Sequence, residues 1–160
     1  MSRKSWFTII VAALIGVIGV GVAPTAAMAD TKPGKDLSKV SSLAAVPDIE
    51  WNTAVEGTPP SSGLNCVSTT GATACLEAYG DILWVKDTAA DSASAVADWD
   101  NYVGGTLTRW GYCRNSLGSG KWAYCNKNFT EGSELRLRAA VYDGSEGTWI
   151  RWSGTLYLTT

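Results

Sequence analysis

Aromatic side chains are the most prominent residues of this chain that can do chemistry. The sequence contains eight tryptophans and six tyrosines, and their rings combine a large apolar surface with a polar edge. A solvent-facing set of such rings beside arginines could stack against a sugar ring. The predicted platform comprises Trp110, Tyr112, Trp122, Tyr124, Arg136, Arg138, Trp149 and Trp152. The alternative is that the rings pack in the core or pair across strands, with cation–π contacts that only stabilise a sheet.

A second candidate for binding is the cysteine-bracketed segment GYCRNSLGSGKWAYCNK, residues 111–127. Its centre is rich in turn-forming residues, which predicts a β-hairpin clamped by Cys113 and Cys125. A braced loop with Arg114 or Leu117 at its tip has the general form of the loops that secreted inhibitors insert into protease clefts. Preorganisation of this kind lowers the entropic cost of binding. The alternative is a simple hairpin turn.

The chain has four cysteines, at positions 66, 75, 113 and 125. An even number in a small exported chain predicts two disulfides. Three pairings are possible, and we expect the local one, Cys66 with Cys75 and Cys113 with Cys125, because each pair brackets turn residues. The closely spaced cysteine pairs of a zinc site are absent from the sequence, so we expect no metal.

Catalysis is disfavoured because the chain contains no histidine. Histidine is the usual general base and the commonest metal ligand, so its absence excludes Ser-His-Asp, Cys-His and histidine-zinc machinery. Carboxylate pairs remain possible in principle. We interpret four acids as solvated loop charges instead: Asp81, Asp87, Asp98 and Asp100. The acidic run over residues 87–100 is a weak candidate for calcium. We expect no cofactor, and an enzyme is the least favoured class of protein.

The first 29 residues have the pattern of a secretory signal peptide. Arg3 and Lys4 precede an apolar run over residues 6–22, and Ala27-Met28-Ala29, with a small residue at each end, forms a cleavage signal. The apolar run is short for a membrane span, so we expect cleavage before Asp30, secretion, and no stable membrane anchor afterwards. Without this segment the chain has 11 basic and 15 acidic residues, a net charge of −4. That balance disfavours nucleic acid as a partner.

Residues 30–63 are predicted to be a leader or linker, partly disordered. They contain four of the five prolines, which argues against a central strand there. A short helix over residues 36–45 is the alternative, and Ile49 and Trp51 are candidates for a segment that docks at the edge of the domain. The predicted domain spans residues 64–160.

Short β-patterned segments separated by turn signals fill residues 64–160. The clearest is residues 134–142, where Leu135, Leu137, Ala139 and Val141 alternate with polar or smaller residues. About seven to nine such strands predict an all-β fold, a small antiparallel β-sandwich or barrel stapled by two disulfides. Residues 88–99 fit either a hairpin tip or an alanine-rich helix, and we favour the hairpin.

Residues 74–144 resemble a group of small secreted actinobacterial proteins of unassigned function. The resemblance is carried by GDILWVKDTAADSASAVADW, by the cysteine-bracketed segment and by FTEGSELRLRAAVYDG. It implies export and a disulfide, and it implies no reaction.

Together these features predict a secreted, monomeric, non-catalytic binding or envelope-associated protein. Its ligand would be extracellular, with a polysaccharide as the candidate, bound through the aromatic platform. The alternative is an extracellular protease inhibitor that uses the loop between Cys113 and Cys125.

Overall fold

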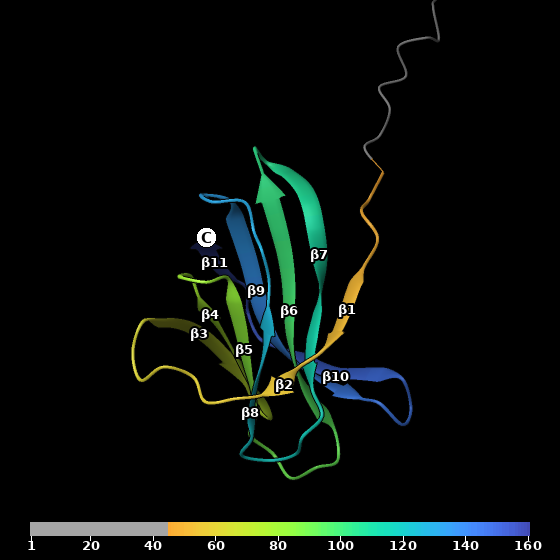
Figure 1. The fold of residues 1–160 in the computed structure, drawn as a ribbon. Coiled ribbons are helices and arrows are strands. Elements are labelled where there is room, and N and C mark those ends of the chain that lie inside the picture. Colours follow the sequence, from red (N-terminus) through yellow and green to blue (C-terminus); the bar gives the residue numbers. More distant parts are fainter. Residues whose placement is uncertain (1–44) are drawn as a thin grey trace, which may run out of the picture. The chain divides into compact units, whose positions relative to one another are not determined.

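The computed structural model describes residues 45–160 of the chain, which form an all-β sandwich of eleven strands in two sheets (Figure 1). The first sheet, sheet A, contains β1 (Glu50–Thr53), β6 (Ser94–Val103), β7 (Thr106–Asn115), β9 (Glu134–Asp143), β10 (Thr148–Trp152) and β11 (Leu156–Thr159). Sheet B contains β2 (Val55–Glu56), β3 (Leu64–Thr69), β4 (Ala72–Glu77), β5 (Ile82–Asp87) and β8 (Trp122–Asn126). The predicted signal peptide and the linker up to residue 44 lie outside the described residues.

The sandwich forms because alternate residues of its strands are apolar. In β9, Leu135, Leu137 and Ala139 are fully buried between the sheets, whereas Arg136 and Arg138 point outward and are partly exposed. Strand alternation of this kind places one apolar face of each sheet against the other, and removal of that surface from water drives the packing. Trp99 of β6 and Leu83 of β5 meet the same core from opposite sheets.

Sheet A has the order β1-β7-β6-β9, and both β10 and β11 pair with the free edge of β9. Between these two strands Ser153 continues the pairing, because its backbone N–H donates to Ala139 O at 2.8 Å and its Oγ accepts from Ala139 N–H at 2.9 Å. The register of β10 shifts between Trp149 and Arg151. This bulge lets Trp149 and Trp152 lie on one face, since residues three apart in a regular strand point to opposite faces.

The first strand of the sandwich begins at Glu50, inside the predicted linker and at the place where Trp51 was a candidate for an edge segment. Strand β1 runs parallel to β7, and the chain then crosses at buried Ala54 to pair β2 with β8 in sheet B (Figure 1). The backbone N–H of Ala54 donates to Arg114 O at 2.8 Å. Part of the predicted linker therefore forms two short strands, β1 in sheet A and β2 in sheet B. The parallel pairing of β1 is the exception in otherwise antiparallel sheets.

Both predicted disulfides are confirmed, with the local pairing. Cys66 and Cys75 face each other across β3 and β4 within sheet B. Cys113 and Cys125 instead join β7 of sheet A to β8 of sheet B, so the expected β-hairpin between them is wrong. The segment is a crossover between sheets, and its disulfide ties the two layers together. Two disulfides are typical of a protein from an oxidising environment.

Residues 88–99 also form a crossover. Strand β5 lies in sheet B and β6 in sheet A, so they do not pair as a hairpin, and the helical alternative is wrong because β6 begins at Ser94. Ser92 turns the chain with a φ of 64°. Within residues 45–160 no helix is long and apolar enough to cross a membrane.

Candidate functional site

Six aromatic rings form a contiguous cluster on the outer side of sheet A, which we call the aromatic face. It comprises Trp51 of β1, Trp110 and Tyr112 of β7, Tyr142 of β9, and Trp149 and Trp152 of β10. Neighbouring ring centroids lie between 4.7 and 6.2 Å apart, within the range of favourable aromatic pairs. The strands bring together residues that are up to about a hundred positions apart in the sequence.

Trp149 lies at the centre of the aromatic face. Its ring centroid is 4.7 Å from that of Tyr112, 6.0 Å from that of Trp51 and 5.1 Å from that of Trp152. Trp51 and Trp152 remain 43% and 42% exposed, whereas the other four residues are half-buried. The planes of most pairs are strongly tilted, and the most nearly parallel pair is Trp149 with Trp152, at 32°. The cluster is thus an interlocked set of rings with two accessible members.

A buried carboxylate lies under the aromatic face. Asp98 of β6 is 2% exposed, and its Oδ2 accepts hydrogen bonds from Trp152 Nε1 at 3.1 Å and from Arg138 Nη2 at 2.8 Å. Burial raises the pKa of Asp98 to about 6, against the opposing attraction of Arg138. Asp100 lies farther out, 4.0 Å from the same Arg138 nitrogen. The hydrogen bond that the Trp152 N–H donates to Asp98 holds the plane of the indole.

Arginines border the aromatic face on two sides. The Arg114 guanidinium lies 5.2 Å from the Tyr142 ring centroid, and its Nε donates to Ser94 Oγ at 3.0 Å. Arg138 is partly exposed beside Asp98. These groups offer hydrogen-bond donors at the rim of an apolar surface, which is the arrangement that a polar ligand with an apolar face requires.

The predicted platform is divided between the two sheets. Trp110, Tyr112, Arg138, Trp149 and Trp152 lie together on the outer side of sheet A. Arg136 lies in the same sheet but joins a separate cluster, with its guanidinium 3.9 Å from the Tyr102 ring centroid and its Nε donating to Glu134.

Trp122 and Tyr124 lie on β8 in sheet B, so they cannot share a surface with Trp110 and Tyr112. Tyr124 packs against Trp84 at 5.1 Å, and Lys86 Nζ lies 5.6 Å from the Trp122 ring centroid. The prediction placed both arms in one hairpin, and the crossover between sheets separates them.

The candidate inhibitor loop is only partly as predicted. Leu117 is 43% exposed at the turn after β7. Arg114 lies within β7 and is held by Ser94 and Tyr142, so it is not at the tip. The turn itself is held by Asn115, whose Oδ1 accepts from the Leu117 N–H at 3.0 Å.

Three acids expected to be solvated are buried instead. Asp81, Asp87 and Asp98 are 9%, 2% and 2% exposed. Asp81 Oδ2 accepts from the Phe129 N–H at 3.0 Å and Asp87 Oδ1 from the Ala89 N–H at 3.0 Å, so both brace loops. Among the described residues, no group of three or more Cys, Asp or Glu side chains is placed to hold a metal ion.

Sequence reasoning missed Trp51, Tyr142 and Asp98 as members of this site. Trp51 reaches the aromatic face because β1 pairs with β7 in parallel, with Trp51 opposite Tyr112. Tyr142 and Asp98 could have been found from strand alternation, since Tyr142 shares a strand face with Arg138 and Asp98 shares one with Asp100. Comparison of the chain with protein-family models, with curated proteins and with solved structures found no match.

Proposed function

We propose that this is a secreted, monomeric, non-catalytic protein, free or associated with the cell envelope, that binds a glycan through the aromatic face. The observation that carries the proposal is the pair of accessible indoles, Trp51 and Trp152, on either side of Trp149. Secretion is supported by the signal-peptide pattern and by the two disulfides.

The binding mode follows from the chemistry of the rings. The C–H face of a sugar ring stacks on the exposed face of Trp152, and a neighbouring sugar reaches Trp51. Sugar hydroxyls accept hydrogen bonds from Arg138 and donate to Asp100 at the rim. Because Asp98 holds the Trp152 indole, little conformational freedom is lost on binding.

The spacing of the rings favours a short oligosaccharide segment of a polymer over a monosaccharide. A neutral or weakly charged polysaccharide fits best, because the acids and arginines around the aromatic face offset each other. The net charge of −4 without the signal segment disfavours polyanions.

Affinity electrophoresis and tryptophan fluorescence against a panel of soluble cell-wall and plant polysaccharides test this proposal. We expect one polysaccharide to retard the oxidised protein and to shield its fluorescence from an aqueous quencher. Trp51→Ala and Trp152→Ala should each weaken binding by about fivefold to a hundredfold, the effect of losing roughly 1–3 kcal/mol of stacking. Trp152→Phe keeps an aromatic ring, so it should lose less affinity than Trp152→Ala.

Trp122→Ala is the matched control, because Trp122 is a half-buried ring on the other sheet. It should bind like the unmodified protein. Equal loss in all tryptophan variants would indicate general damage to the fold, and a protein indifferent to every polysaccharide would refute the proposal.

The alternative function is inhibition of an extracellular protease. The observation that favours it is the exposed Leu117 on a turn whose flanking strands are joined by the Cys113–Cys125 disulfide. In that case Leu117→Asp would abolish inhibition, whereas Trp152→Ala would leave it unchanged. Inhibition assays on a panel of secreted proteases separate the two functions.

A further inference from the structure

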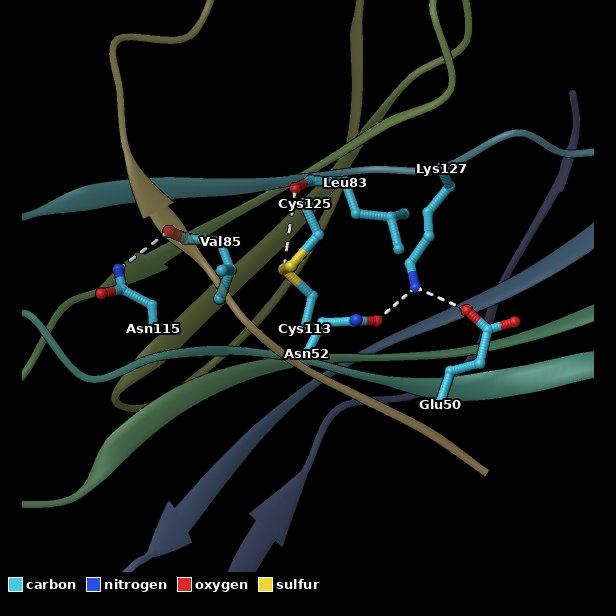
Figure 2. The surroundings of a disulfide bond; sticks show 8 residues. All are labelled: Glu50, Asn52, Leu83, Val85, Cys113, Asn115, Cys125 and Lys127. Atoms are coloured by element: carbon cyan, nitrogen blue, oxygen red, sulfur yellow. Dashed lines mark hydrogen bonds and ion pairs between the residues drawn. A yellow bond between two sulfur atoms is a disulfide. The ribbon is translucent and has the colours of Figure 1, made fainter. Parts of the chain in front are cut away.

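The edge of the sandwich where β1 meets the end of β8 contains a lysine, an asparagine and a glutamate in direct contact. Lys127 Nζ donates to Asn52 Oδ1, and it also contacts Glu50 Oε2 at 2.9 Å. Figure 2 shows the amine of Lys127 between the other two side chains, next to the Cys113–Cys125 disulfide. Glu50 and Asn52 are two residues apart in β1, so both point toward β8 from the same side of the strand.

The Lys127 amine is shielded from solvent. Its side chain is 4% exposed, and Nζ lies 4.5 Å from the ring centroid of Trp99, which is fully buried. Phe129 packs on the same ring at 5.4 Å. Burial lowers the pKa of Lys127, which increases the fraction of neutral amine, the nucleophilic form.

Glu50 is positioned to accept the proton that the amine must lose. Arg109 holds its carboxylate through two hydrogen bonds, from Nε to Oε1 at 2.8 Å and from Nη2 to Oε2 at 3.2 Å. These bonds lower the pKa of Glu50, which keeps the carboxylate ionised and free to accept a proton but also makes it a weaker base. They also fix Oε2 toward Lys127, so Arg109 acts as a positioning residue.

Asn52 lies at the solvent side of the cluster. It lines a cavity of about 260 Å³ together with Thr53, Val55, Tyr124, Cys125 and Asn126. Asn52 therefore contacts the buried amine and also borders a cavity large enough to take a small leaving group.

We propose that Lys127 and Asn52 form an intramolecular isopeptide bond, a covalent amide between Lys127 Nζ and Asn52 Cγ. Glu50 Oε2 takes a proton from the Lys127 ammonium. The lone pair of Nζ then attacks Cγ, and the carbonyl electron pair moves to Oδ1. Glu50 transfers this proton to Nδ2, the Cγ–Nδ2 bond breaks with its electron pair leaving on nitrogen, and the carbonyl re-forms as ammonia departs. Glu50 takes the second proton from Nζ, which leaves a neutral amide, and that proton passes to the departing ammonia to give ammonium. The reaction needs no oxidant, reductant or cofactor.

The bond would have a structural role at this edge. Strand β1 contains four residues, and among residues 45–160 it pairs with β7 alone. An amide to the residue after β8 would anchor β1 to the opposite sheet, as the disulfide beside it anchors β7 to β8. This proposal is independent of glycan binding.

Intact-mass spectrometry of the folded, secreted full chain after reduction and alkylation tests the proposal. We expect a mass lower by one ammonia molecule than the sequence requires. Trypsin should fail to cleave after Lys127, because its side chain is acylated, and fragmentation should identify a linked pair of peptides, one containing Asn52 and the other Lys127. Lys127→Arg and Asn52→Ala should both show the full calculated mass.

Glu50→Gln removes the proton acceptor at nearly constant volume and should leave most of the protein unlinked. Asn126→Ala is the matched control, because Asn126 lines the same cavity, and it should stay linked. Asn52→Ala retains the contact between Lys127 and Glu50, so it keeps the test informative if Lys127→Arg fails to fold. A folded chain of full mass that trypsin cleaves after Lys127 overturns the proposal. So does an ammonia loss that maps to a single unlinked peptide.

Discussion

Asp98 provides a quantitative test of the forces under the aromatic face. Two effects oppose each other at this carboxyl: burial favours its neutral form, and Arg138 at 2.8 Å favours its charged form. Its other neighbours are Asp100, the Trp152 N–H and Tyr112, whose own pKa is raised by burial and by Asp98. Burial prevails, because the pKa rises from an ordinary 3.8 to about 6. The test is to replace Asp98 with Asn, which has the same shape and does not titrate.

The sign of the effect follows from proton linkage. Between about pH 3.8 and 6 the folded protein holds the Asp98 proton more tightly than the unfolded chain does, so the free energy of unfolding falls as pH rises through this window. At roughly 1.4 kcal/mol for each pKa unit, Asp98 contributes on the order of 3 kcal/mol more to stability at pH 3.5 than at pH 7.5. Asp98→Asn lacks this contribution, whereas the other titrating groups are common to both proteins.

The assay is urea unfolding of the oxidised proteins at several pH values from 3.5 to 7.5, followed by tryptophan fluorescence. The quantity to compare is the difference in unfolding free energy between the unmodified protein and Asp98→Asn. We expect the free energy of unfolding of the unmodified protein to fall by about 3 kcal/mol relative to that of the variant as pH rises from 3.5 to 7.5. A difference that stays constant with pH would mean that Arg138 cancels the effect of burial, and one that moves toward the unmodified protein at higher pH would mean that Arg138 outweighs it. Either result would refute the reasoning.

Three further substitutions test the fold. Gly111→Ala would place a Cβ 2.1 Å from Glu50 O, so we expect the free energy of unfolding to fall by about 1–3 kcal/mol and amide hydrogen exchange in β1 to become faster. Unchanged exchange would contradict the parallel pairing of β1 with β7. Ser92 has a left-handed φ of 64°, which glycine adopts without strain, so Ser92→Gly should raise the free energy of unfolding by about 1 kcal/mol. A lower free energy of unfolding would contradict that turn geometry. Replacing both Cys113 and Cys125 with Ala should cost about 3 kcal/mol in urea unfolding, and a change near zero would show that packing alone holds β7 to β8.

Local patterns in the sequence were sufficient to predict the class of fold. The alternation of residues 134–142 predicts β9, because a strand buried on one face needs apolar residues at every second position. The disulfide pairing follows from proximity along the chain, since both pairs bracket short turns. Each of these features depends on residues fewer than about fifteen positions apart.

Sheet membership could not be predicted in the same way. A turn of Asn, Ser and Gly residues suits a hairpin within one sheet and a crossover between two sheets equally well, and the strands on either side alternate identically in both cases. The expectation that Trp122 and Tyr124 join Trp110 and Tyr112 was wrong for this reason. Likewise, Trp51 joins the aromatic face only through pairing between β1 and β7, residues about sixty positions apart.

Strand β1 connects the two proposals made for this protein. Its alternation directs Trp51 outward to the aromatic face and the flanking Glu50 and Asn52 toward Lys127. Within the described part of the chain β1 is short and pairs with β7 alone, so it would ordinarily fray. Trp51, one of the two accessible rings of the aromatic face, would then move with it. Anchoring Asn52 to Lys127 would hold the backbone on either side of Trp51, so its indole would keep its place beside Trp149 before any ligand arrives. The covalent bond and the binding surface would then serve the same end, because a preorganised ring loses less entropy when a sugar stacks on it.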